Sequence, residues 1–263
     1  MSALDLSILL PALAAGLLVT ATHVPLGMQV LARGIVFIDL AIAQIAGCGV
    51  IVADRLGFEA QGIAVQVAAF AAALGGALLL TWTEKAWPDV QEALIGVVFA
   101  LGATASLLLL ASNPHGSEHL RDLLVGQILW AEPSRLAWTA LVYAAVLAAW
   151  FGLRERIGRA GFYVLFALTV TVSVQLVGLY LVFATLIVPP LATRRMARGR
   201  LAASWGLGVA GYAAGLLLST AFDLPTGAVI VWTLAAAALA WYPFTRAARR
   251  SPAAATAPPI PGR

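Results

Sequence analysis

The chain has 263 residues, of which 62% are hydrophobic and only 11% are charged, and its mean hydropathy is +0.94. Soluble domains carry about 25% charged residues, so this composition excludes an ordinary soluble protein and indicates a polytopic, all-α membrane protein. The net charge of +4 comes from basic residues in short loops, which gives no reason to expect nucleic acid as a partner. The only cysteine, Cys48, lies in an apolar run, so an internal disulfide is excluded.

Apolar segments follow one another along the chain and predict about nine transmembrane helices. No basic residue precedes the first segment, so we expect a retained span and not a cleaved signal peptide. Residues 1–246 are expected to form one transmembrane domain, and residues 247–263 a disordered cytoplasmic tail rich in Pro and Ala. The segments are 7–31, 35–53, 62–83, 92–112, 135–152, 161–177, 178–193, 202–222 and 226–245.

Residues 161–193 are the most informative stretch, because none of these 33 residues is charged. As one helix they would extend about 50 Å, whereas the hydrocarbon core of a bilayer is about 30 Å thick. Arginines lie on both sides of the stretch, and basic loops prefer the cytoplasmic side. The stretch is therefore predicted to form two short spans that turn back near Gly178, with both basic borders in the cytoplasm.

The distribution of basic residues orients the predicted bundle. With the N-terminus outside and the C-terminus in the cytoplasm, 13 of the 16 Lys and Arg residues lie on the cytoplasmic side. An eight-span arrangement would move one of the two arginine-rich loops to the outside, which is disfavoured. The nine-span arrangement is therefore preferred.

His23 is the only histidine predicted to lie within a span, two residues before Pro25. A proline inside a helix removes one backbone hydrogen bond and kinks the helix. An imidazole beside freed carbonyl groups suits the path of a small cation and makes His23 a candidate metal ligand. The alternative is a histidine that is hydrogen-bonded to a neighbouring helix.

Asp39 and Gln44 are further candidate ligands on the second predicted span. They are five residues apart, about 140° around a helix, so they share a broad face at most. Asp39 would alternatively be a helix cap or an interfacial residue. Gln44 would alternatively form a hydrogen bond between helices.

The predicted outer loop after the fourth span contains His115, Glu118 and His119. If this loop is helical, the two histidines share a face at a spacing that suits Zn²⁺ or a similar borderline metal. The alternative is a solvated polar loop with no ligand. The next stretch, near residues 120–131, is apolar but too short to cross the membrane, so a re-entrant or interfacial helix is predicted there.

Four segments, in this order, resemble motifs of the membrane permeases of ATP-binding-cassette importers for zinc, manganese and iron. Residues 94–99, LIGVVF, are similar to A-I-G-I-V-F, and residues 122–129, DLLVGQIL, are similar to a D-L-L…G-x-I-L stretch with residues missing. Residues 177–189 resemble V-G-x-L-L-V-x-A-L-L-x-I-P, and residues 223–228 match D-L-P-T-G-A. The resemblance covers about residues 12–245.

This resemblance implies a multi-pass permease subunit in a bacterial inner membrane, working as a homodimer or pseudo-dimer. Two copies of a separate ABC ATPase would bind ATP on the cytoplasmic face, and a periplasmic metal-binding protein would dock outside. The chain departs from the family in two places. Gln44 stands where the family has a histidine, and residues 154–161 replace a longer cytoplasmic coupling helix.

The leading hypothesis from the sequence is import of a divalent metal ion by alternating access, with zinc as the first expectation and manganese or iron as alternatives. The chain has no nucleotide-binding or catalytic motif, so it is not expected to be an enzyme or to hold a resident cofactor. The shortened coupling region keeps a second hypothesis open, an ATPase-independent metal channel or secondary transporter. A third is a membrane scaffold for a metal-handling partner.

Overall fold

The protein is described by a computed structural model that places residues 6–58, 62–110, 124, 126, 128–153 and 156–247. Within these residues the regular structure is entirely helical, as the composition predicts. The helices are α1 (Leu6–Arg33), α2 (Ile38–Arg55), α3 (Ile63–Ala86), η1 (Pro88–Val90), α4 (Gln91–Leu110), η2 (Ile128–Trp130), α6 (Pro133–Leu153), α7 (Gly158–Val177), α8 (Leu179–Ala192), α9 (Arg200–Phe222) and α10 (Thr226–Ala247).

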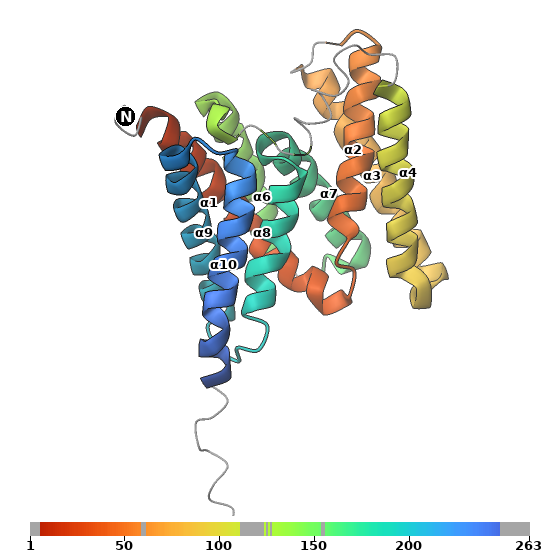
Figure 1. Cartoon of the computed structure of the whole chain (residues 1–263). Helices are drawn as coiled ribbons and strands as arrows, with labels where there is room; N and C mark the ends of the chain where they lie inside the picture. The colour runs from red at the N-terminus through yellow and green to blue at the C-terminus, as the bar shows by residue number, and fades with distance from the viewer. Residues whose placement is uncertain are drawn as a thin grey trace, which may run out of the picture.

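The helices are arranged in two groups that meet at α7 (Figure 1). Helices α2, α3 and α4 pack on one another in the first group, and α7 packs against α2 and α3. In the second group α8 lies against α1, α9 and α10, while α6 lies against α1. The helices are apolar on most sides, which is expected for elements that contact lipid outside and one another inside.

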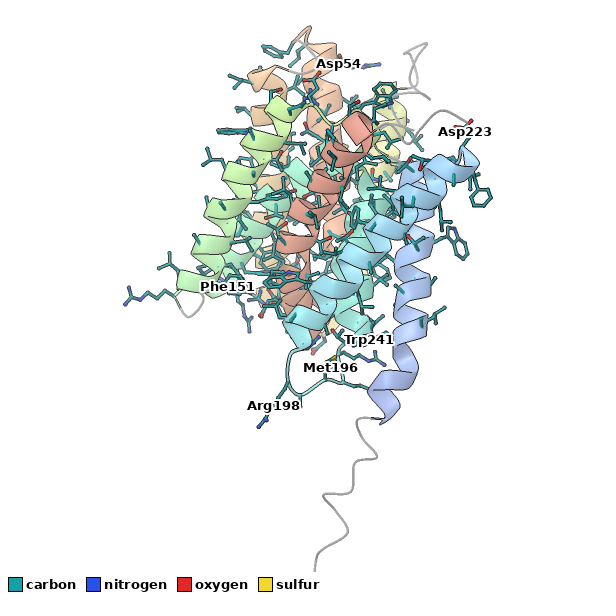
Figure 2. All side chains as sticks on the ribbon, turned by 90° about the vertical axis from the view of Figure 1, so that its left-hand side faces the viewer. Asp54, Phe151, Met196, Arg198, Asp223 and Trp241 are labelled. Carbon is teal, nitrogen blue, oxygen red and sulfur yellow. The ribbon has the colours of Figure 1, made fainter. Side chains whose placement is uncertain are left out.

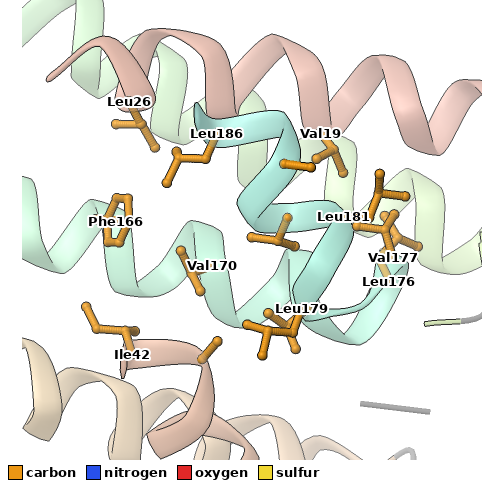
Figure 3. Packing of buried hydrophobic residues seen from close by; sticks show 14 of the residues in the cluster. Val19, Leu26, Ile42, Phe166, Val170, Leu176, Val177, Leu179, Leu181 and Leu186 are labelled. Atoms are coloured by element: carbon orange, nitrogen blue, oxygen red, sulfur yellow. The ribbon is translucent and has the colours of Figure 1, made fainter. Parts of the chain in front are cut away.

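The core lies where α1, α2, α7 and α8 come together (Figure 3). Val19 of α1, Ile42 of α2, Phe166 of α7 and Leu186 of α8 are all buried there. Side chains from four helices therefore fill the centre of the bundle, and the polar groups described below are set into this packing.

Six helical segments among the described residues are long and apolar enough to cross a bilayer: Ser7–Arg33, Ile63–Ala86, Pro88–Leu110, Pro133–Leu153, Gly158–Val177 and Arg200–Phe222. Two further apolar helices, Leu179–Ala192 and Thr226–Trp241, are shorter. Helix α2 has 18 residues and carries Asp39, Asp54 and Arg55. The protein is thus a multi-pass helical membrane protein.

The predicted break near Gly178 is present. Helix α7 ends at Val177 and α8 begins at Leu179, and Gly178 between them has φ 82° and ψ 160°. This backbone conformation is essentially restricted to glycine. Arg198 lies at the same end of the bundle as Phe151, near the start of α7, and Asp54 and Asp223 lie at the opposite end (Figure 2). The two basic borders of the hairpin therefore lie at one end of the bundle.

Two other predicted segments lie largely outside the described residues. Of the predicted re-entrant helix near residues 120–131, Ile128–Trp130 form one turn of 3-10 helix. The tail after residue 247 lies outside the described residues altogether.

Candidate functional site

Gly126, two residues before η2, lies against the turn of the α7–α8 hairpin. Gly126 has φ +70°, and a Cβ atom built there would lie 2.2 Å from the carbonyl carbon of Val177 and 2.4 Å from the nitrogen of Gly178. Only glycine fits this approach. The carbonyl groups at the end of α7 have no donors within that helix, so Gly126 lies against backbone that is open to polar contacts.

His23 lies in the centre of the bundle and is completely buried. Its Nδ1 atom is 2.9 Å from the carbonyl oxygen of Val19, one turn earlier in α1. The Thr22 hydroxyl is 3.1 Å from the same nitrogen and also lies 3.1 Å from the Val19 carbonyl. The Nε2 atom of His23 is buried and has no hydrogen-bond partner among the described residues.

Hydroxyl groups from four other helices lie around this level of the bundle. Tyr143 of α6 places its ring edge-on to His23, with ring centroids 6.4 Å apart, and its hydroxyl is hydrogen-bonded to Ser173 of α7. Thr185 of α8 and Tyr212 of α9 are joined at 2.9 Å. Each of these four side chains is at least 99% buried, so helices α1, α6, α7, α8 and α9 each contribute at least one polar side chain to the interior.

Helices α1 and α8 pack against each other near these hydroxyl groups, and both helices contain prolines. Pro25 leaves the carbonyl of Ala21 without its usual donor four residues on, and Pro189 and Pro190 do the same for Thr185 and Leu186. Freed carbonyl oxygens therefore lie on both helices close to His23.

Asp39 is completely buried in the first turn of α2, and its carboxylate has no side-chain partner among the described residues; only the backbone N–H groups of Asp39 and Leu40 lie within electrostatic reach. It precedes Ile42 by one turn, and Ile42 points into the core near Phe166 (Figure 3). His23 lies ten residues before the end of α1, about 15 Å along the axis. Among the described residues the two side chains do not share a hydrogen bond.

Gln44 faces away from His23. A Cβ atom at Gly102 of α4 would be 3.0 Å from the Gln44 Cβ, and Cys48, one turn later, is 3.2 Å from the Gly102 carbonyl and from the Ser106 hydroxyl. This face of α2 packs on α4. The geometry supports the alternative role of Gln44 in contacts between helices, and it does not bring Gln44 together with Asp39.

The sequence alone did not single out a group of polar residues at the end of the bundle where α1 and α3 terminate. The Arg33 guanidinium lies over the ring of Phe162, 4.4 Å from the centroid. The Tyr163 hydroxyl is within electrostatic reach of Glu84, Gln91 and Arg33. Arg33 and Glu84 are both partly buried, and neither their residue types nor their spacing in the sequence signals that they lie near Tyr163 of α7.

The predicted outer ligands His115, Glu118 and His119 lie outside the described residues. Among the residues that the structure places, no group of three or more His, Cys, Asp and Glu side chains could hold a metal ion.

The loop between α8 and α9 is fixed to the ends of both helices. The Thr193 hydroxyl donates to the Pro189 carbonyl at 3.2 Å and contacts the Ser204 hydroxyl at 2.5 Å, and Arg200 donates to the Pro190 carbonyl at 3.3 Å. The loop arginines Arg194, Arg195 and Arg198 are exposed. By contrast, only residues 154–157 separate α6 from α7, which leaves no room for a separate coupling helix.

Comparison with known proteins identifies the family. The sequence model of the ABC 3 transport family matches residues 5–157 and 137–244. An uncharacterised membrane protein of Synechocystis is 28% identical over 257 residues, which cover 89% of this chain and 90% of that protein. A probable iron transport system membrane protein of Haemophilus influenzae is 26% identical over 197 residues, 66% of this chain and 72% of that protein.

A solved structure shares the fold. PsaBC from Streptococcus pneumoniae, in complex with a Fab, superposes with a TM-score of 0.76 at 21% sequence identity, over 93% of this chain and 95% of that chain. The helical order, the broken α7–α8 hairpin and the matched residues all agree with the resemblance found in the motifs. The chain belongs to the ABC 3 transport family and is a membrane permease of the ABC metal-transport type.

Proposed function

We propose that this chain is the permease subunit of an ABC importer that carries a divalent transition-metal ion across a bacterial inner membrane. The observation that carries the proposal is the family match over nearly the whole chain. The relative named as part of an iron transport system supports metal as the cargo. Zinc is the metal that we expect first, with manganese and iron as alternatives.

In the proposed topology α1–α4 and α6–α10 all cross the membrane, with the N-terminus outside and the C-terminus in the cytoplasm. The short α8 and the charged α2 are then true spans. The clustering of Phe151 and Arg198 at one end of the bundle supports this orientation (Figure 2), because it brings the basic loops to one side. Asp54 and Asp223 would face the outside.

The proposed route begins at the outer segment around His115, Glu118 and His119 and passes the hairpin turn at Gly178. Broken helices in transporters expose backbone carbonyls and helix ends to the cargo, and Gly126 would close this turn in the present conformation. The route continues past His23 and leaves near Asp39, whose unpartnered carboxylate is a suitable oxygen ligand.

The proposed partners are an ABC ATPase on the cytoplasmic face, a periplasmic metal-binding protein outside and a second copy of this chain. Because the connection between α6 and α7 is short, the fixed loop between α8 and α9 is the proposed contact for the ATPase. Its exposed arginines suit an acidic surface, and its anchors at Pro189 and Pro190 link it to the helix that packs on α1.

The test is metal uptake into proteoliposomes that contain this chain together with the ABC ATPase and binding protein of its own transport system. Uptake that requires ATP and all three components is the expected result. Uptake by this chain alone, insensitive to ATP, would instead favour the ATPase-independent channel or secondary transporter, for which the short connection between α6 and α7 is the motivating observation. No metal uptake under either condition would refute the proposal.

A further inference from the structure

The hydrogen bonds of His23 determine which ring nitrogen is available to a ligand. The carbonyl oxygen of Val19 only accepts hydrogen bonds, so its 2.9 Å contact assigns the proton to Nδ1. In the neutral ring the lone pair then lies on Nε2. Histidines that ligate metals through Nε2 commonly donate their other ring N–H to a backbone carbonyl in this way, so His23 is held in a metal-binding tautomer.

The Nε2 atom makes no hydrogen bond that would explain its burial in the bundle. It is buried and has no hydrogen-bond partner among the described residues, although His23 is completely enclosed. Burying an unpaired acceptor is unfavourable, and such groups in native structures usually have a functional or ligand-related explanation. If the role of His23 were only to form a hydrogen bond to a neighbouring helix, Nε2 would be expected to make that bond.

Neutral oxygen groups lie on the helices around His23. Tyr143 lies edge-on to the imidazole and is hydrogen-bonded to Ser173, and Pro25 frees the carbonyl of Ala21 two residues before His23. Among the residues that the structure places, no group of three or more His, Cys, Asp and Glu side chains could hold a metal ion. One imidazole with neutral oxygens favours a borderline cation over Mg²⁺ or Ca²⁺.

We propose that His23 Nε2 is a transit ligand for the divalent cargo, midway through the bundle, completed by hydroxyl or carbonyl oxygens. This inference rests on the proposed function, because it assigns a ligand within the same route. It also specifies the class of cargo as a borderline divalent ion such as Zn²⁺ or Fe²⁺.

The first test observes His23 directly. The chain has 3 histidines, so a His115→Ala/His119→Ala variant, purified without a histidine tag, retains one imidazole. With ¹⁵N-labelled histidine in nanodiscs, we expect a protonated Nδ1 and an Nε2 resonance that shifts when Zn²⁺ is added but not when Mg²⁺ is added. A proton on Nε2, or an Nε2 resonance unchanged by excess Zn²⁺, would overturn the inference.

The second test separates ligation from packing by comparing two substitutions. His23→Asn retains an amide near the Nδ1 position but removes Nε2, and it should lower metal uptake about tenfold or more with an unchanged melting temperature. His23→Gln restores an oxygen near the Nε2 position and should recover part of the uptake. Parallel losses of uptake and melting temperature in both variants would assign His23 to packing.

The two tests distinguish this inference from the proposed function. Full uptake by His23→Asn would remove His23 from the route while leaving the importer assignment intact. Conversely, absence of uptake in the wild type would refute the importer, whereas the Nε2 resonance would still decide whether His23 binds a metal.

Discussion

Gly27 of α1 lies directly against the carbonyl group of Leu186 in α8. A Cβ atom at position 27 would be 1.8 Å from the Leu186 oxygen and 3.3 Å from the ring of Pro190. The Leu186 oxygen is one of the carbonyls that the prolines of α8 deprive of a helical donor. The close contact between α1 and α8 therefore requires that residue 27 has no Cβ atom. This contact lies one turn along α1 from His23.

We expect Gly27→Ala to separate α1 from α8. The obstacle is backbone, which cannot rotate away, so overpacking should cost about 1–3 kcal/mol or more and lower the melting temperature of the purified protein by several degrees. The matched control is Gly96→Ala in α4, where an added Cβ meets nothing within 4 Å. Equal melting temperatures for the two variants would show that the α1–α8 contact is looser than described.

Gly178→Ala should be more harmful than Gly199→Ala, although both glycines have positive φ angles. Gly178, with φ 82° and ψ 160°, lies in a region that is essentially restricted to glycine, and an alanine there costs about 1–3 kcal/mol. Gly199 has ordinary left-handed angles of 67° and 13°, for which the cost is about 1–2 kcal/mol. Melting temperature and metal uptake should both be measured on the two variants. A higher melting temperature for Gly178→Ala than for Gly199→Ala would contradict the prediction.

Asp39→Asn should reduce metal uptake without destabilising the protein. The carboxylate is fully buried and has no side-chain partner among the described residues, so replacing it with a neutral amide removes an unfavourable desolvation. We expect the melting temperature to stay the same or rise, while uptake at limiting metal falls. A large fall in melting temperature would instead assign Asp39 a structural role at the start of α2.

Neutralising the loop between α8 and α9 should weaken binding of the ATPase. The triple change Arg194→Gln, Arg195→Gln and Arg198→Gln removes exposed charges but keeps the Thr193 and Arg200 anchors. Co-purification with the ATPase of the same transport system should fall about tenfold. The matched control, Arg156→Gln with Arg159→Gln, alters the other basic border, and a larger loss in that variant would place the contact at the connection between α6 and α7.

Single cysteines at the two basic borders should report the same side of the membrane. In a Cys48→Ser background, Arg159→Cys and Arg198→Cys should be protected from an impermeant maleimide in intact cells and labelled in inverted vesicles. Asp223→Cys should show the opposite pattern. Labelling of the two border positions from different sides would contradict the nine-span topology.

The sequence was sufficient to predict the helices and the turn between α7 and α8. Uncharged stretches bounded by arginines mark helix ends closely, and residues 161–193 are too long for a single span. The structure places the end of α7 at Val177, one residue before the predicted break at Gly178. These features depend on the length and charge of short segments, which can be read directly from the sequence.

The arrangement of side chains between helices could not be predicted in the same way. Asp39 and Gln44 are about 140° apart around the helix, which does not determine the neighbouring helix that either side chain faces. The packing of α2 on α4 places Gln44 against Gly102. The hydrogen bond between Tyr143 and Ser173 joins two helices whose rotation no sequence pattern fixes. Likewise, the approach of Gly126 to Val177 depends on the tertiary fold.

The shortness of α8 has a consequence for the energy of an ion that moves beside it. Its 14 residues extend about 21 Å, less than the hydrocarbon thickness of about 30 Å. Most of its residues are buried against α1, α9 and α10, so in the nine-span arrangement the ends of these longer helices, and not lipid, would cover the remaining depth of the bilayer. An ion that moves beside α8 in that arrangement would pass a shorter stretch of helical backbone than beside a full-length span.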